Sequence, residues 1–110
     1  VEIFDFVRRS TGRVPPVVDA ADLLAAPGPT LRALCAALGI PFSERMLSWP
    51  AGRRATDGVW SKYWYDRVER STGFEPAEPA EVPRLHGRLA GLEARCRPLY
   101  EHLHAHCLRA

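Results

Sequence analysis

Apolar side chains recur at the three- and four-residue spacing of an α-helix in four stretches of the chain. These stretches span residues 2–11, 31–38, 60–72 and 84–110. A glycine follows each of the first three, at Gly12, Gly39 and Gly73. Glycine is common just beyond a helix C-terminus because it adopts a positive φ without steric cost. We therefore predict four helices, with the first three ending at these glycines.

Two of the predicted helices have a defined apolar face. In the first, Ile3, Phe6 and Val7 lie on one side, as in an amphipathic helix that packs on a core. In the third, the apolar residues follow the spacing i, i+4 and i+8; they are Trp60, Trp64 and Val68. One interpretation of this third helix is that its tryptophans belong to the core.

A valine-rich segment, 14–19, lies between the first two predicted helices. Pro15 and Pro16 lack the N–H that a helix needs, and valine favours extended backbone. We predict one short strand there, in a chain that is otherwise mostly α-helical. Asp19 and Asp22 follow it and are typical of turn and cap chemistry rather than of a catalytic carboxylate pair.

The last predicted helix carries a regular apolar seam. Its members, spaced four and three residues apart, are Leu85, Leu89, Leu92, Cys96, Leu99 and Leu103. Pro98 removes one helical hydrogen bond, so we predict a kink there. We expect the seam to pack against the rest of the domain or to mediate self-association. Prolines and glutamates in 75–83 indicate a linker, which divides the chain into 1–74, the linker, and the C-terminal helix of 84–110.

Composition narrows the classes of function. The chain has 110 residues, 46% of them hydrophobic and 25% charged, which is typical of a folded domain. A net charge of +2 does not indicate nucleic-acid binding, and no apolar run reaches the length of a membrane span. The three cysteines lack C-x-x-C spacing and are expected to be free thiols in the cytoplasm. Because the sequence opens within a helical pattern, we expect the C-terminal piece of a longer protein.

No residue pattern predicts a catalytic group or a metal site. His102 and His106 share a helical face, His104 points elsewhere, and no third ligand is placed by spacing. The serines and cysteines do not lie in a nucleophile-elbow pattern. The phosphate-binding sequence G-x-x-x-x-G-K-[ST] is absent from these residues.

The stretch 49–65 is the most distinctive candidate for binding, because it contains all three tryptophans and an arginine pair between two glycines. Arginine presents a planar fork of donors that fits phosphate oxygens, and glycine lets backbone N–H groups approach a ligand. The alternative interpretation is a solvated basic loop that leads into an amphipathic helix.

The order of these elements resembles the C-terminal half of sulfotransferases, in particular the bacterial sulfotransferase-like branch of the P-loop proteins. In that family a strand ends in an acidic residue, Asp-Leu and a proline turn follow, and a helix closes with Leu-Gly. The matching segments here are 17–24, Pro27 and 38–41. The resemblance covers 16–73.

The same family carries a late Arg-Lys-Gly-x-x-Gly-x-Trp-Lys motif. That motif holds the 3′-phosphate of 3′-phosphoadenosine 5′-phosphosulfate, the sulfuryl donor. The residues that the resemblance assigns to donor binding are Arg53, Arg54, Gly58, Trp60 and Lys62. Arg54 occupies the lysine position, Ala55 replaces the first glycine, and Lys62 lies one residue beyond the closing position. The resemblance also implies that Trp60 anchors this loop to the following helix.

What the resemblance implies is an α/β parent fold of the P-loop NTPase type, with the P-loop half outside this chain. The chain would contribute a 3′-phosphate clamp for sulfuryl transfer to an unidentified acceptor and would be inactive alone. The expected partners are the nucleotide and the P-loop half, with no metal, nucleic acid or membrane. Two alternatives remain open: a helical interaction module that associates through the Leu85–Leu103 seam, and a relative that keeps the fold without the chemistry.

Overall fold

The computed structural model describes residues 1–76 and 83–109 of the chain. Its elements in chain order are α1 (Glu2–Thr11), α2 (Ala20–Ala25), α3 (Pro27–Leu38), the 3₁₀ helix η1 (Glu44–Met46), α4 (Ser61–Trp64), α5 (Asp66–Arg70) and α6 (Gly87–His104). The mostly helical character predicted from the sequence is therefore present in the described residues. Whether the chain belongs to a larger α/β fold stays a prediction.

Helix α1 ends where the sequence predicts but buries a different face. Gly12 takes a left-handed φ of 67° and closes the helix. The buried residue is Phe4, whereas Ile3 and Phe6 are 80% and 63% exposed. The prediction of a core face through Ile3, Phe6 and Val7 was wrong, because α1 packs through Phe4 against residues almost one hundred positions away in the sequence.

The N-terminal parts of α2 and α3 are set by local chemistry. The Asp19 carboxylate caps α2 by accepting a hydrogen bond from the Ala21 N–H at 2.7 Å. Helix α3 begins at Pro27, earlier than the predicted start at 31, because proline fixes the φ of a first helical turn and needs no N–H there. Thr30 lies buried inside α3.

The predicted strand at 14–19 is reduced to a single pairing. Among the described residues, Val17 forms an isolated parallel bridge with Cys107, and the Leu108 N–H donates to the Val17 carbonyl at 2.9 Å. Pro15 and Pro16 have no N–H to offer, and a ladder needs a neighbouring strand that this part of the chain does not supply.

The helix predicted at 60–72 is broken in two. At Tyr65 the backbone leaves the helical region (φ −99°, ψ 3°), so α4 and α5 are separate short helices. Trp60, Trp64 and Val68 are 66%, 75% and 54% exposed, so they form no core face in this structure. Without a buried stripe, four- and five-residue helices depend on other contacts for their stability.

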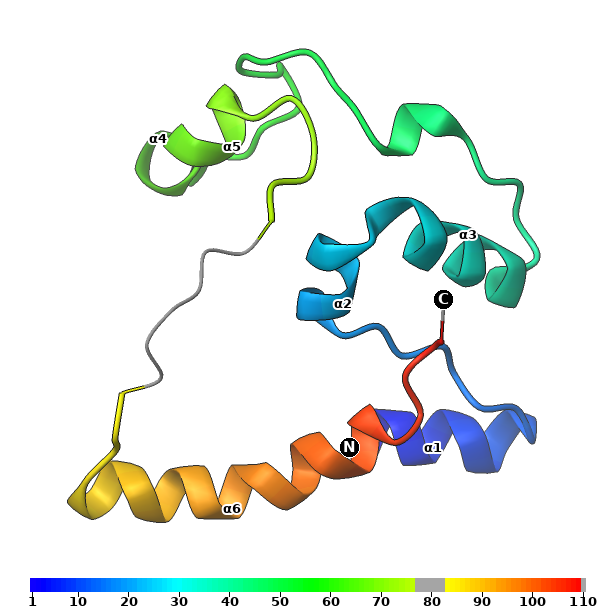
Figure 1. Cartoon of the computed structure of the whole chain (residues 1–110), viewed down its shortest axis with the longest axis vertical. Coiled ribbons are helices and arrows are strands. Elements are labelled where there is room, and N and C mark those ends of the chain that lie inside the picture. The colour runs from blue at the N-terminus through cyan, green and yellow to red at the C-terminus, as the bar shows by residue number, and fades with distance from the viewer. Residues whose placement is uncertain (77–82, 110) are drawn as a thin grey trace.

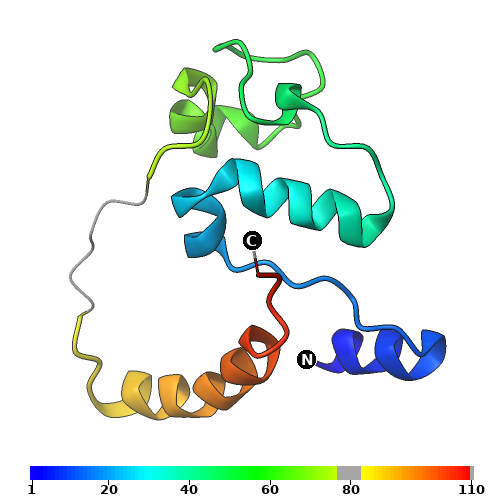
Figure 2. The ribbon, with the colours of Figure 1, turned by 45° about the vertical axis from the view of Figure 1, so that its right-hand side comes forward.

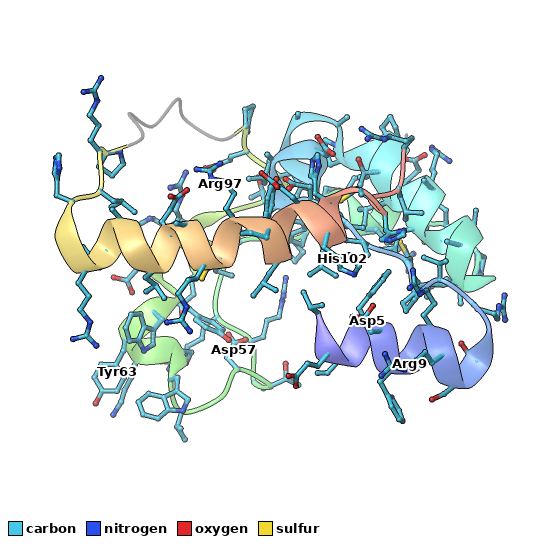
Figure 3. The ribbon with its side chains drawn as sticks, turned by 90° about the horizontal axis from the view of Figure 1, so that it is seen from below. Asp5, Arg9, Asp57, Tyr63, Arg97 and His102 are labelled. Carbon is cyan, nitrogen blue, oxygen red and sulfur yellow. The ribbon has the colours of Figure 1, made fainter. Side chains whose placement is uncertain are left out.

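Helix α6 joins the N-terminal part of the chain only near its own C-terminal end. His102 Nε2 lies 3.3 Å from Asp5 Oδ1 of α1 (Figure 3). The Tyr100 hydroxyl donates to Asp19 Oδ2 at 2.8 Å. The helix starts at Gly87, so Leu85 of the seam precedes it, while Pro98 remains inside it. Of the predicted linker 75–83, residues 77–82 lie outside the described residues.

The described elements are spread out rather than packed around one core. Figures 1 and 2 show α4 and α5 at the top, α2 and α3 in the middle, and α6 along the bottom. The radius of gyration is 17.2 Å, compared with about 13 Å for a compact domain of this length. Much apolar surface therefore remains exposed. None of the described helices is both long and apolar enough to cross a bilayer.

Candidate functional site

The arginine loop is closed at its base by backbone pairing. Ser48 and Gly73 form an antiparallel bridge, and the Trp49 N–H donates to the Thr72 carbonyl at 3.0 Å. A Cβ at Gly73 would lie 3.1 Å from the Leu47 carbonyl oxygen, so the close approach of the two segments favours glycine there. This closure makes 48–73 one local unit, which contains α4 and α5.

The indole that anchors this unit is that of Trp49. Its Nε1–H donates to Ser71 Oγ at 3.0 Å, and its ring meets Phe74 edge-to-face at 5.5 Å. Trp60, which the family resemblance assigned to anchoring, is 66% exposed and lies 6.3 Å from the Tyr63 ring. The anchoring role predicted for Trp60 therefore belongs to Trp49 in this structure.

Arg53 is held by residues of both short helices. Its Nη2 donates to Ser61 Oγ at 2.7 Å, and its Nε lies 3.8 Å from Glu69 Oε1. The Glu69 carbonyl also accepts from the Gly52 N–H at 2.7 Å. Gly52 has a φ of 117°, which L-residues with a side chain rarely adopt. Glu69 thus fixes the backbone just before Arg53 as well as facing its guanidinium.

Arg54 lies in a tight turn, and the environment of its guanidinium differs from that of Arg53. The Arg54 N–H donates to Asp57 Oδ2 at 2.8 Å, and the Asp57 N–H returns to the Arg54 carbonyl at 3.0 Å. Across 1–76 and 83–109, no carboxylate lies within 4.0 Å of the Arg54 guanidinium. The two neighbouring arginines therefore differ: one is fixed by polar contacts and the other retains its donors.

The remaining predicted site residues are only partly brought together. A Cβ built at Gly58 meets no atom within 4 Å, so its backbone faces open space. Lys62 Nζ lies 4.8 Å from the centre of the Tyr63 ring, a cation–π contact on α4. The structure thus connects Arg53 to the start of α4 and leaves Trp60 and Lys62 on the outer surface.

Three residues of the unit were missed by the sequence reasoning. Ser61 is the least exposed side chain of the described residues, at 1%, and Glu69 faces the same arginine. Neither has a local signature, because a serine before an aromatic run and a glutamate in a charged helix are both common. Asp57 could have been found, since an aspartate followed by a glycine, as in Asp57-Gly58, is typical of a turn.

A second polar cluster joins α6 to α2 and flanks a small cavity of about 140 Å³ lined by Asp19, Tyr100 and Cys107, among others. The Tyr100 hydroxyl is the largest influence holding the pKa of Asp19 below its usual value, and the Asp19 carboxylate in turn raises the pKa of Tyr100. Burial is the main reason that the pKa of Cys107 is raised, which keeps this thiol protonated. His104 stacks on the Tyr100 ring at 5.2 Å.

These contacts fit a structural junction better than a reactive site. The carboxylate and the phenol satisfy each other, and the thiol is in its unreactive form. His102 and His106 approach to 5.7 Å between ring centres, but the described residues contain no group of three His, Cys, Asp or Glu side chains placed to hold a metal.

The 110 residues match the sequence model of one protein family, described as the sulfotransferase domain, over residues 7–107. The chain belongs to the sulfotransferase domain family. The match includes the arginine loop, both short helices and all of α6. No solved structure matches the chain significantly.

Two relatives from Arabidopsis thaliana are similar to this chain in sequence. "Branched-chain-amino-acid aminotransferase-like protein 2" is 42% identical and "Branched-chain-amino-acid aminotransferase-like protein 1" is 45% identical, each over 97 residues. The alignments cover 86% of this chain but only 17% of each relative. Each name describes a whole, longer protein, and this chain aligns with only a small part of it.

Proposed function

We propose that the 48–73 unit binds the 3′-phosphate of 3′-phosphoadenosine 5′-phosphosulfate during sulfuryl transfer to an unidentified acceptor. The observation that carries the proposal is the arginine pair: Arg53 is fixed in place, and none of the described carboxylates pairs with the Arg54 guanidinium. The sulfotransferase family assignment supports the choice of this nucleotide. The match of Arg53, Gly58 and Trp60 to the family's donor-binding motif supports the location.

The residues present fit a phosphate. Both guanidinium groups have donors that reach solvent, and the Arg53 side chain is 58% exposed. The open space above Gly58 allows a phosphate oxygen to approach the backbone. Hydrogen bonds from arginine to a charged oxygen contribute about 1.5–3 kcal/mol each. Lys62, which faces the Tyr63 ring, is a weaker candidate for phosphate binding than the two arginines. The exposed Trp60 does not hold either arginine in place.

Sulfuryl transfer also needs groups that these residues do not supply. An in-line displacement requires that the donor's leaving phosphate be positioned and its charge be stabilised. We propose that a P-loop segment outside these 110 residues provides this, and that the chain alone has no transferase activity. The exposed aromatic residues of 59–64 support a partner surface, since contiguous apolar patches commonly mark interfaces.

The proposed compartment is the cytoplasm. The structure leaves all three cysteines, Cys35, Cys96 and Cys107, as free thiols. Free thiols are the usual state of cysteine in a reducing compartment. When all three cysteines are replaced by serine, an added oxidant should produce almost no intermolecular crosslinks.

The test of the phosphate clamp compares two nucleotides by NMR titration of the ¹⁵N-labelled chain, which detects weak binding. Arg53→Ala should lower the affinity for adenosine 3′,5′-bisphosphate by roughly tenfold or more, because a charged hydrogen bond is lost. The affinity for adenosine 5′-monophosphate should change much less. Arg67→Ala removes an exposed, ion-paired arginine of the same unit and serves as the control. Equal losses for the two nucleotides would contradict the 3′-phosphate role.

A second candidate function is self-association through α6. No residue of this helix is fully buried, and its seam leucines Leu89, Leu92 and Leu99 are 59%, 53% and 52% exposed. We expect a weak dimer whose fraction rises with concentration and which Leu92→Glu abolishes, as measured by sedimentation velocity. Ala94→Glu, on the helix but off the seam, is the control. A monomer at millimolar concentration would exclude this function.

A further inference from the structure

The contacts of Arg53 are unusual for a side chain in an irregular loop. Its hydrogen-bond acceptor, Ser61 Oγ, belongs to the most buried side chain of the described residues. The Ser61 backbone is fixed as well, since its N–H donates to the Gly58 carbonyl at 3.0 Å and its carbonyl accepts from Tyr65 at 3.0 Å. Arg53 is therefore attached to a point that has little freedom of its own.

The two partners of Arg53 contact two of its three guanidinium nitrogens. Nε, which faces Glu69, and Nη2, which donates to Ser61, form the side edge of the group. Guanidinium has five N–H donors in a fixed planar fork. Nη1, at the end of the group, makes no hydrogen bond or ion pair with the described residues. The described residues place no carboxylate there.

We propose that Ser61 is a positioning residue for the 3′-phosphate clamp. By accepting from Nη2, it fixes the plane of the Arg53 guanidinium so that the Nη1 end of the group binds two phosphate oxygens at once. This inference rests on the proposed function, since it assumes that Arg53 binds a phosphate. It also gives the two arginines different roles: Arg53 binds the phosphate in a fixed orientation, and Arg54 adds positive charge. We call this difference the division of labour within the arginine pair.

The division of labour follows from what is fixed before the ligand arrives. A group that is already oriented loses little conformational entropy on binding, so its hydrogen bonds contribute more to affinity. Within the described part of the chain, Arg54 is anchored through its backbone turn with Asp57 and not through its side chain, so the ligand must order that side chain. A lysine, which is a point charge without a fork, should therefore replace Arg54 better than Arg53.

The experiment titrates ¹⁵N-labelled Ser61→Ala and Ser61→Thr chains with adenosine 3′,5′-bisphosphate and 5′-monophosphate. Ser61→Ala should weaken bisphosphate binding about fivefold with little change for the monophosphate, since one oriented hydrogen bond is lost. Ser61→Thr keeps the hydroxyl and should restore binding. The Arg53 Nε–H signal gives an independent readout: it should broaden in Ser61→Ala, because the guanidinium is no longer held.

The outcomes separate this inference from the proposed function. Loss of selectivity in Arg53→Ala but full binding in Ser61→Ala would overturn the positioning role and leave the clamp intact. No effect of Arg53→Ala would overturn both. Should Ser61→Ala fail to fold, Arg53→Lys and Arg54→Lys decide the matter. The first should lose selectivity and the second should keep most of it, and equal behaviour of the two would contradict the inference.

Discussion

The region of α1 to α3 and the 48–73 unit are held together by different forces. The first region contains the buried apolar side chains, Phe4 and Cys35, and packs the end of α6 against α1. The second has Ser61 as its buried side chain and is closed by backbone pairs and polar contacts. Apart from Trp49, which packs on Phe74, its tryptophans and Tyr63 face outward instead of filling a core.

This difference in forces matches a difference in what each region must specify. Apolar burial is roughly proportional to area and does not specify direction, which suits a scaffold. Hydrogen bonds have definite lengths and angles, which suits a site that must aim a guanidinium. In the 48–73 unit, polar groups therefore set the orientation of Arg53, while aromatic side chains at 60–64 stay exposed.

The largest expected contrast lies between two aromatic residues, one from each region. Phe4→Ala should lower the free energy of unfolding by about 3 kcal/mol, because it leaves a cavity between His102 and His106. Trp64→Ala, at 75% exposure, should change it by less than about 0.5 kcal/mol. Urea denaturation followed by circular dichroism measures both. A large loss in Trp64→Ala would mean that the aromatic surface packs within this chain.

A smaller contrast concerns two glycines of the arginine loop. Gly52→Ala should destabilise the loop by about 1–3 kcal/mol, since its φ of 117° strains any residue with a side chain. Gly58→Ala should be nearly neutral for stability, because its Cβ would meet open space. The measurement is hydrogen exchange of the backbone amides at positions 52 and 57, in the original chain and in each variant. Under the proposed clamp, Gly58→Ala should still weaken bisphosphate binding, which stability measurements alone would not reveal.

The smallest expected effect is a pH shift at the junction of α6 with α2. Tyr100→Phe should raise the pKa of Asp19 toward its ordinary value, because the phenol hydrogen bond is the main cause of the lowering. A lowered pKa stabilises the fold above the unfolded-state value of about 3.9, and this stabilisation is lost as the pH falls through the folded-state value. A ¹³C titration of the carboxyl group reports it. Tyr65→Phe is the control, and an unchanged Asp19 pKa in Tyr100→Phe would contradict the assignment.

The ends of two helices could be predicted from local patterns, but the long-range contacts could not. Gly12 and Gly39 end α1 and α3 as predicted, because a positive φ is a property of the residue itself. The buried face of α1 was mispredicted because Phe4 packs against His102 and His106. Periodicity within the helix cannot indicate these distant contacts. The break at Tyr65 likewise interrupts a spacing that favours one continuous helix.

For the candidate site, the sequence by itself determined which residue types are available: two arginines, flanking glycines and a following aromatic run. It also placed the chain near the sulfotransferases through the order of its motifs, and the family match agrees. Only the tertiary structure decided that Arg53 is fixed and Arg54 is not, and that Trp49 anchors the loop instead of Trp60. The physical reason is that a side chain's chemistry is local, whereas its orientation depends on acceptors such as Ser61 and Glu69, which folding brings to it.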